Sequence, residues 1–201
     1  MRVLVIGGGG TIGSHLVPAL TQRDHDVVVA SRSGGDVQVD ITDSASITRM
    51  YQHTPQLDAV VVIAASGPLD QFATLTAAEL VENSRGKLFG QLDVVLTGQH
   101  HLNDGGSFTL TSGIFADQAW PRVTGGAVVS GGVHSFVLSA AIELPRDLRV
   151  NVVSPTMVEE SADVFGDQFP GLRPVPLDAL VNHYLDCIEG EDTGRIVRVY
   201  D

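Results

Sequence analysis

Cysteine, basic residues and long apolar runs are scarce in this sequence, and each shortage excludes a class of protein. The 201 residues include one cysteine, Cys187, so no internal disulfide can form, which agrees with a reducing compartment. No apolar run reaches the roughly 18 to 20 residues of a membrane-spanning helix, and the N-terminus reads as a strand rather than as a secretory signal. We therefore expect a cytoplasmic protein with no membrane partner.

The charge balance narrows the possible partners further. The 12 basic residues are outnumbered by 24 acidic ones, which gives a net charge of −12. A field of this sign repels nucleic acid, so we expect no nucleic-acid partner. No His or Cys spacing forms a set of metal ligands, so no metal is expected either. An anionic cofactor would need local help from backbone N–H groups and a few well-placed cations.

Short β-branched runs alternate with helix-like segments along the whole chain. The expected strands are residues 3–6, 27–30, 37–39, 59–64, 107–111, 149–153 and 195–199, and the expected helices are residues 11–22, 43–51, 76–97, 126–144 and 177–188. This alternation predicts an α/β protein: a single doubly wound Rossmann domain over residues 1–201 with a mostly parallel sheet of about seven strands.

Two connections depart from regular alternation. Only residues 31–36 separate the second and third expected strands, which is too short for a crossover helix, so a shortened link is predicted there. Residues 156–176 are rich in Pro, Gly and acidic residues, and they have the position and length of a substrate loop or lid.

A glycine-rich turn follows the first expected strand and opens the first expected helix. It contains the pattern Gly7-x-x-Gly10-x-x-Gly13, with Thr11 and Ile12 inside it. In a strand–turn–helix unit these glycines allow a tight turn, close approach of the backbone to a pyrophosphate, and close packing of the helix on the strand. The phosphates would lie at the helix N-terminus, where free N–H groups favour negative charge. The pattern therefore predicts a dinucleotide site.

The end of the second expected strand indicates which dinucleotide is bound. NAD-specific Rossmann proteins place an acid there to accept hydrogen bonds from the ribose. This chain has Ser31, Arg32 and Ser33 instead. A guanidinium makes forked, charge-assisted hydrogen bonds to phosphate, so the segment favours NADP over NAD. The alternative is that Arg32 is a solvated surface residue.

Further segments resemble the short-chain dehydrogenase/reductase family over nearly the whole chain. The family's Asp-Val-Thr-Asp is similar to Asp40-Ile41-Thr42-Asp43, and its Asn-Asn-Ala-Gly is similar to Ala64-Ala65-Ser66-Gly67. The strand that ends in the family's catalytic Ser is similar to Phe108-Thr109-Leu110-Thr111-Ser112. The strand before the family's Pro-Gly is similar to Arg149-Val150-Asn151-Val152-Val153-Ser154-Pro155, which Thr156 follows. The resemblance implies a catalytic role for Ser112. It also implies cofactor contacts from Asp40, Ile41, Ala64, Ala65, Ser66, Pro155, Thr156 and Val158.

The resemblance fails at two residues that carry the family's chemistry. In the family a Tyr transfers the substrate proton, and a Lys four residues later lowers the pKa of that Tyr and binds the nicotinamide ribose. Aligning residues 139–144 without gaps to the family's helix places Gly125 at the Tyr position and Val129 at the Lys position. Neither side chain transfers protons, and all three tyrosines of the chain lie outside this helix.

Three other residues are candidates for part of the missing chemistry. Lys87 replaces the Asn of the family's Asn-Leu-x-Gly motif, and it either points into the active-site cleft or is a solvated helix residue. A small atypical branch of the family shares this Lys and lacks the Tyr-x-x-x-Lys pair, and the chain is most similar to that branch. Asp117 lies in the loop after Ser112 and is a candidate replacement acid or base. His134 is interpreted as a packed or interface residue, with a base as the alternative.

The leading hypothesis is an NADP-dependent oxidoreductase that acts on a small organic carbonyl or alcohol. Ser112 would polarise the substrate oxygen, and Lys87 would supply a proton or a charge. Two alternatives stay open: a non-redox isomerase, cyclase or lyase on the same fold, and a catalytically silent NADP(H)-binding sensor or scaffold. The resemblance also implies a homodimer or homotetramer, formed through the helices around residues 87–97 and 131–141.

Overall fold

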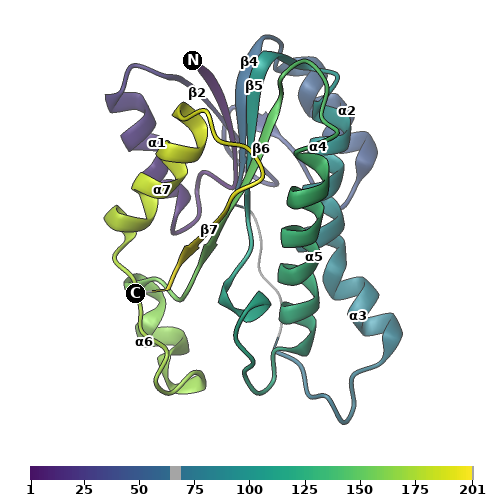
Figure 1. The fold of residues 1–201 in the computed structure, drawn as a ribbon, viewed down its shortest axis with the longest axis vertical. Coiled ribbons are helices and arrows are strands. Elements are labelled where there is room, and N and C mark those ends of the chain that lie inside the picture. The colour runs from purple at the N-terminus through teal and green to yellow at the C-terminus, as the bar shows by residue number, and fades with distance from the viewer. Residues whose placement is uncertain (64–68, 201) are drawn as a thin grey trace.

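The computed structural model describes residues 1–63 and 69–200, which are built around one seven-stranded sheet (Figure 1). The strand order is β3-β2-β1-β4-β5-β6-β7, and all neighbouring strands are parallel. The strands are β1 (Arg2–Ile6), β2 (Asp26–Ser31), β3 (Val37–Gln38), β4 (Leu57–Val62), β5 (Leu102–Thr111), β6 (Arg149–Pro155) and β7 (Ile196–Val199). The predicted doubly wound fold is confirmed. The winding direction reverses between β1 and β4, which is where such sheets bind ligands.

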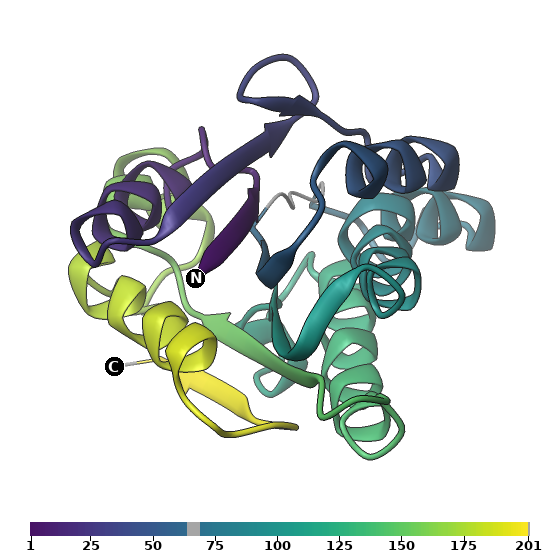
Figure 2. The same cartoon turned by 90° about the horizontal axis from the view of Figure 1, so that it is seen from above.

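Helices cover both faces of this sheet (Figure 2). On one face lie α1 (Gly13–Gln22) and α7 (Leu177–Glu189), and on the other lie α2 (Ser44–His53), α4 (Gln91–Gly98) and α5 (Thr124–Ala140). Each face has its own apolar core, because the strands are buried on both sides. None of the helices in the described residues is both long and apolar enough to cross a membrane.

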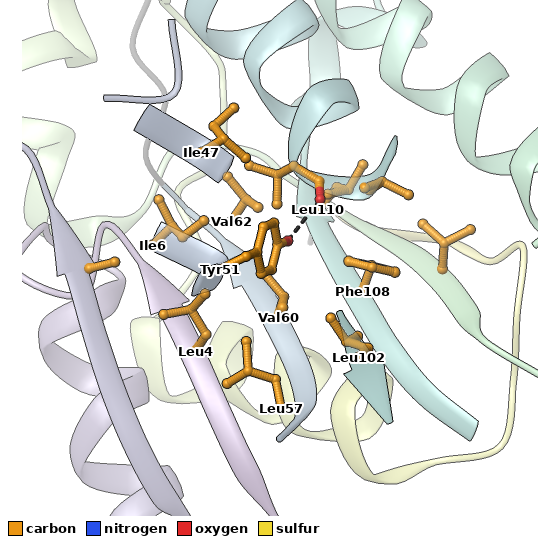
Figure 3. Close-up of a cluster of buried hydrophobic side chains, with 14 of the residues drawn as sticks. Leu4, Ile6, Ile47, Tyr51, Leu57, Val60, Val62, Leu102, Phe108 and Leu110 are labelled. Atoms are coloured by element: carbon orange, nitrogen blue, oxygen red, sulfur yellow. Dashed lines mark hydrogen bonds between the residues drawn. The ribbon is translucent and has the colours of Figure 1, made fainter. Parts of the chain in front are cut away.

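The core under α2 and α4 is centred on Tyr51 (Figure 3). Its ring packs among apolar side chains of β1, β4 and β5, and it is 1% exposed. The buried hydroxyl donates a hydrogen bond to the Val94 carbonyl oxygen at 2.7 Å. This bond satisfies the polar atom of the ring and fixes α2 against α4.

The link between β2 and β3 contains no helix, as its length predicts. Asp36 closes the turn through two hydrogen bonds to Val29 of β2. Its N–H donates to the Val29 carbonyl oxygen at 2.8 Å, and its carboxylate accepts from the Val29 N–H at 2.9 Å. Gly35 precedes it with a φ of +86°, a conformation that suits glycine. The chain therefore passes directly from β2 into the sheet-edge strand β3.

The helix expected over residues 76–97 is interrupted, which differs from the prediction. It begins at the predicted capping box of Thr76 and Glu79 as α3 (Ala77–Ser84), passes through the π-helical turn η1 (Arg85–Gly90) and continues as α4. At Gly90 an added Cβ would lie 2.6 Å from the Ile41 carbonyl oxygen, so this turn packs directly on backbone. Such a turn is common at functional sites and leaves no signal in apolar periodicity.

Two segments extend beyond the carboxyl ends of the strands. Figure 1 shows α3 on one side and α6 (Ala162–Phe165) on the other. The segment that contains α6 also holds two short 3₁₀ turns, η3 (Glu159–Ser161) and η4 (Gly166–Gln168), and an isolated parallel bridge joins Val158 to Val175 across its base. The predicted loop or lid therefore lies at the edge of the sheet where ligands of this fold bind.

Candidate functional site

The glycine pattern forms a tight turn at the carboxyl end of β1. Gly7 has a φ of +92°, its N–H donates to the Ala30 carbonyl oxygen of β2 at 2.9 Å, and its carbonyl oxygen accepts from the Gly10 N–H at 3.0 Å. A Cβ at Gly13 would lie 2.6 Å from the Gly8 Cα. Helix α1 therefore approaches the turn to a distance that only glycine allows.

The first N–H groups of α1, next to this turn, have no side-chain cap. Ile12 occupies the cap position and supplies no side-chain hydrogen bond, and Thr11 is exposed. Within the part of the chain that the structure describes, no group accepts from the N–H groups of Thr11, Ile12 and Gly13. Free N–H groups at a helix start carry partial positive charge, so the turn fits a pyrophosphate.

The end of β2 brings Arg32 to the same edge of the sheet. Arg32 is exposed and, together with Asp40, lines a surface cavity of about 580 Å³. Ser31 is used in the turn, since its hydroxyl donates to the Gly34 carbonyl oxygen at 2.5 Å and accepts from the Gly34 N–H at 2.9 Å. Ser33 is exposed. Of these three predicted residues, Arg32 has the side chain best placed to meet a phosphate in the cavity.

Asp40 and Ile41 connect β3 to α2. The Asp40 carboxylate accepts from the Thr42 N–H at 2.9 Å and from its hydroxyl at 2.8 Å. These two hydrogen bonds, with a smaller contribution from the positive charge of Arg32, lower the pKa of Asp40 below its ordinary value. The Ile41 backbone lies against Gly90 of η1. The turn therefore presents a charged carboxylate near Arg32.

Other predicted cofactor residues lie at the ends of β4 and β6. Ala64, Ala65 and Ser66 lie outside the described residues. Pro155 ends β6, and the Thr156 N–H donates to the Val199 carbonyl oxygen at 2.9 Å. Thr156 is 6% exposed, and among the described residues its hydroxyl has no hydrogen-bond partner. A buried hydroxyl of this kind is available to a bound ligand.

Ser112 lies directly after β5 and is paired with His134 in the middle of α5. The Ser112 hydroxyl and the His134 Nε2 are 2.7 Å apart, and the two residues are 3% and 6% exposed. The Ser112 N–H donates to the Val153 carbonyl oxygen at 3.0 Å, which fixes the backbone next to β6. Burial lowers the pKa of His134; Asp117 partly opposes this effect, and the positive charge of Arg198 adds to it.

Lys87 is brought to the end of β5 by a neighbouring side chain. The Gln91 amide donates to the Lys87 carbonyl oxygen at 2.5 Å and to the Thr111 carbonyl oxygen at 2.8 Å, and its own oxygen accepts from the Thr111 N–H at 2.9 Å. Lys87 is half-buried, and burial lowers its pKa. Gln91 thus links the backbone of Lys87 to Thr111, the residue before Ser112. Among the described residues, however, the Ser112 hydroxyl is hydrogen-bonded to His134 and not to Lys87.

Asp117 is held by two residues from the C-terminal end of the chain. Arg198 donates to it through Nε at 2.8 Å and through a terminal nitrogen at 3.1 Å, and the Tyr200 hydroxyl donates at 2.5 Å. The Arg198 hydrogen bonds are the main cause of a lowered pKa at Asp117. Burial first, and then Asp117, raise the pKa of Tyr200 to about 12. Asp117 is therefore a charged carboxylate at neutral pH and is unsuited to donate a proton.

Comparison with known proteins agrees with this geometry. Residues 3–88 match the NAD dependent epimerase/dehydratase family. The chain is 38% identical to the protein lin1944 from Listeria innocua, whose crystal structure it matches with a TM-score of 0.96 over 100% of both chains. It is 27% identical over 176 residues to carbonyl reductase [NADPH] 2 from Sus scrofa, covering 79% of this chain and 72% of that protein. A small-chain dehydrogenase in complex with NADPH matches with a TM-score of 0.87 and 24% identity, over 99% of this chain and 96% of that one. The chain belongs to the short-chain dehydrogenase/reductase family.

The position that the alignment assigns to the Tyr of short-chain dehydrogenases is filled in another way. Gly125 lies in the first turn of α5, and its N–H donates to an Asp70 carboxylate oxygen at 2.5 Å, while the Thr124 N–H donates to the other oxygen at 3.0 Å. A Cβ at Gly125 would lie 2.7 Å from that Asp70 oxygen. The 6% exposed Asp70 carboxylate therefore takes the space of any larger side chain at this position.

Sequence reasoning missed His134 as the partner of Ser112, and it missed Asp70 and Arg198 altogether. The interpretation of His134 as a packed or interface residue agrees with its burial, but its ring nitrogen is hydrogen-bonded to Ser112, the residue predicted to be catalytic. The helical spacing of His134 after Ser130 was the available signal for a shared face. It could not show that this face points at the end of β5.

Proposed function

We propose that the protein is an NADP(H)-dependent oxidoreductase that acts on a small organic carbonyl or alcohol. The observation that carries the proposal is the placement of Arg32 and of the open N-terminus of α1 at the same edge of the sheet. Together they match the charges of a 2′-phosphate and a pyrophosphate. The nicotinamide would supply the hydride chemistry, and the residues of this chain would hold and protonate the substrate.

The neighbours of Arg32 support a preference for the 2′-phosphate. Asp36 and Asp40 line the same cavity, but the Asp36 carboxylate accepts from the Val29 N–H, and the Asp40 carboxylate accepts from Thr42. In the described residues no carboxylate forms an ion pair with the Arg32 guanidinium. Its donors therefore remain available to a phosphate. The names of two similar proteins, which mention NADPH, support the same cofactor.

On the substrate side, Ser112 is the residue best placed to contact the reacting oxygen. Its hydroxyl lies at the carboxyl end of β5, in a buried environment where a hydrogen bond to a developing negative charge is strong. Lys87 would add positive charge from η1. The network of Asp117, Arg198 and Tyr200 would hold the ends of β5 and β7 together around the site.

Isothermal titration calorimetry with NADPH and NADH tests the cofactor assignment. NADPH should bind more tightly than NADH, and Arg32→Ala should weaken NADPH binding by about 10- to 100-fold, the worth of a charge-assisted hydrogen bond. NADH affinity should change by less than about threefold. Arg23→Ala is the matched control, since it removes the same charge from the far end of α1, where Arg23 pairs with Glu189. Equal losses for both cofactors would remove Arg32 from this role.

A second function, silent NADP(H) binding, is favoured by one observation. The Asp70 carboxylate fills the space beside Gly125, at the position where the alignment expects the proton-donating Tyr. A sensor would bind NADPH reversibly and show no oxidation of it with any carbonyl compound. Absorbance at the NADPH wavelength, followed with a panel of small aldehydes and ketones, separates the two functions.

A further inference from the structure

The pair formed by Ser112 and His134 has the geometry of a proton relay. Nε2 of the imidazole is 2.7 Å from the serine hydroxyl, which is within the range for a general base and the group that it deprotonates. The pair is formed across 22 positions of sequence by α5 packing over the end of β5. Both residues are nearly buried, so their hydrogen bond is shielded from bulk water.

A second buried hydroxyl lies one helical turn before His134. Ser130 is 1% exposed, and its hydroxyl has no hydrogen-bond partner among the described residues. It lies 3.7 Å from the position of a Cβ on Gly113, the residue after Ser112, and the Pro155 carbonyl oxygen lies 3.8 Å from the same position. A buried, unsatisfied hydroxyl beside the pair indicates a place for a polar atom of a ligand.

We propose that His134 is the proton-relay partner of Ser112, taking the part that the Tyr plays in other members of the family. This inference rests on the proposed oxidoreductase function. During oxidation of an alcohol, whose carbon would lose its hydride to NADP⁺, the substrate O–H gives its proton to the Ser112 oxygen, the Ser112 proton moves to Nε2 of neutral His134, and His134 becomes an imidazolium. In carbonyl reduction the same protons move in reverse, from the imidazolium through Ser112 to the new alkoxide.

Burial and the charges around His134 together set the direction of its pH dependence. Burial lowers the pKa of His134 most, Asp117 raises it, and Arg198 lowers it. Arg198 and the Tyr200 hydroxyl both donate to Asp117, and Lys87 lies on η1, which packs against α5. The carboxylates of the other helices packed on α5 are engaged elsewhere: Glu79 by Thr76, Glu82 by Arg85, and Asp93 by Ser44 and Thr97. With its pKa lowered from an ordinary value of about 6.5, His134 is a neutral base at neutral pH.

Alcohol oxidation and carbonyl reduction should depend on pH in opposite directions. Alcohol oxidation needs neutral His134, so its rate should fall as the pH drops through the pKa of His134, below about 6.5. Carbonyl reduction needs the imidazolium, so its rate should rise over the same range. A histidine that only satisfies the Ser112 hydroxyl would produce neither trend.

The test compares wild type with His134→Gln, whose amide keeps a donor near Ser112 but has no titratable proton. The assays are NADPH oxidation with benzaldehyde and cyclohexanone, and NADP⁺ reduction with the corresponding alcohols, from pH 5 to 9. We expect His134→Gln to lower kcat by about 100-fold, to leave KM within about threefold and to lose the acidic pH limb. His100→Gln, an exposed histidine after the end of α4, is the matched control and should behave as wild type.

A readout without turnover accompanies the kinetics. In NMR spectra of the protein labelled at the imidazole nitrogens, His134 should titrate below pH 6.5, and Ser112→Ala should shift this titration. Unchanged kcat and pH profile in His134→Gln would overturn the relay and leave the oxidoreductase function intact. A wild type that binds NADPH but turns over none of these compounds would overturn both.

Discussion

The contact between Gly125 and Asp70 makes one substitution a sharp test of the site. Asp70 accepts from the N–H groups of Thr124 and Gly125 and so caps the first turn of α5. A cap of this kind is worth about 1 kcal/mol, and a partly buried carboxylate at a helix start adds about 1 kcal/mol more. Gly125→Ala places a Cβ 2.7 Å from an Asp70 oxygen, so the carboxylate must move.

The opposing effect is the greater helix propensity of alanine, about 0.5 to 1 kcal/mol and smaller in a first turn. Loss of the cap therefore wins, and Gly125→Ala should lower the free energy of unfolding by about 1 kcal/mol. Gly126→Ala is the control, because its Cβ would contact Phe115 at an ordinary 3.7 Å; this variant should be stabilised by up to about 0.5 kcal/mol.

Urea denaturation followed by circular dichroism measures both variants under the same conditions. Asp70→Asn should be destabilised to a similar extent as Gly125→Ala, since it removes the charge and one acceptor of the cap. In the double variant the two losses should not add, because both act on the same hydrogen bonds. Equal stabilisation of Gly125→Ala and Gly126→Ala would refute the account, since it would show that Asp70 yields at no cost.

Three further outcomes can be measured. Tyr51→Phe leaves the Val94 carbonyl oxygen without its buried donor and should cost about 1 to 2 kcal/mol of unfolding free energy in urea. We expect the protein to self-associate through α4 and α5, where Leu96 and Leu138 are exposed, so Leu138→Asp should reduce the mass measured by light scattering, and a monomeric wild type would contradict this. Lys87→Met should lower kcat and leave NADPH affinity, measured by calorimetry, within about fivefold.

The features that sequence reasoning predicted are those set by neighbouring residues. The glycine turn, the capping box of Thr76 and Glu79, and the short link before β3 each depend on a few consecutive positions, and all three are present in the structure. The π-helical turn η1 was missed, and the turn ends at Gly90, which packs on Ile41 nearly fifty positions earlier in the chain. Apolar periodicity carries no trace of such a contact.

In the polar site, too, contacts between distant residues could not be predicted from the sequence, and Asp117 is an example. Its position after Ser112 suggested an acid or base, but its chemistry is decided by Arg198, 81 positions later, which binds both carboxylate oxygens. These hydrogen bonds lower the pKa of Asp117, which stabilises its ionised form, and they tie the loop after β5 to β7. His134 meets the opposite condition: burial keeps it neutral, and its bonded neighbour is a hydroxyl rather than a charge. An acid–base residue in this fold is therefore identified by its hydrogen-bond partner in the folded protein, because the partner helps to set the protonation state of the side chain.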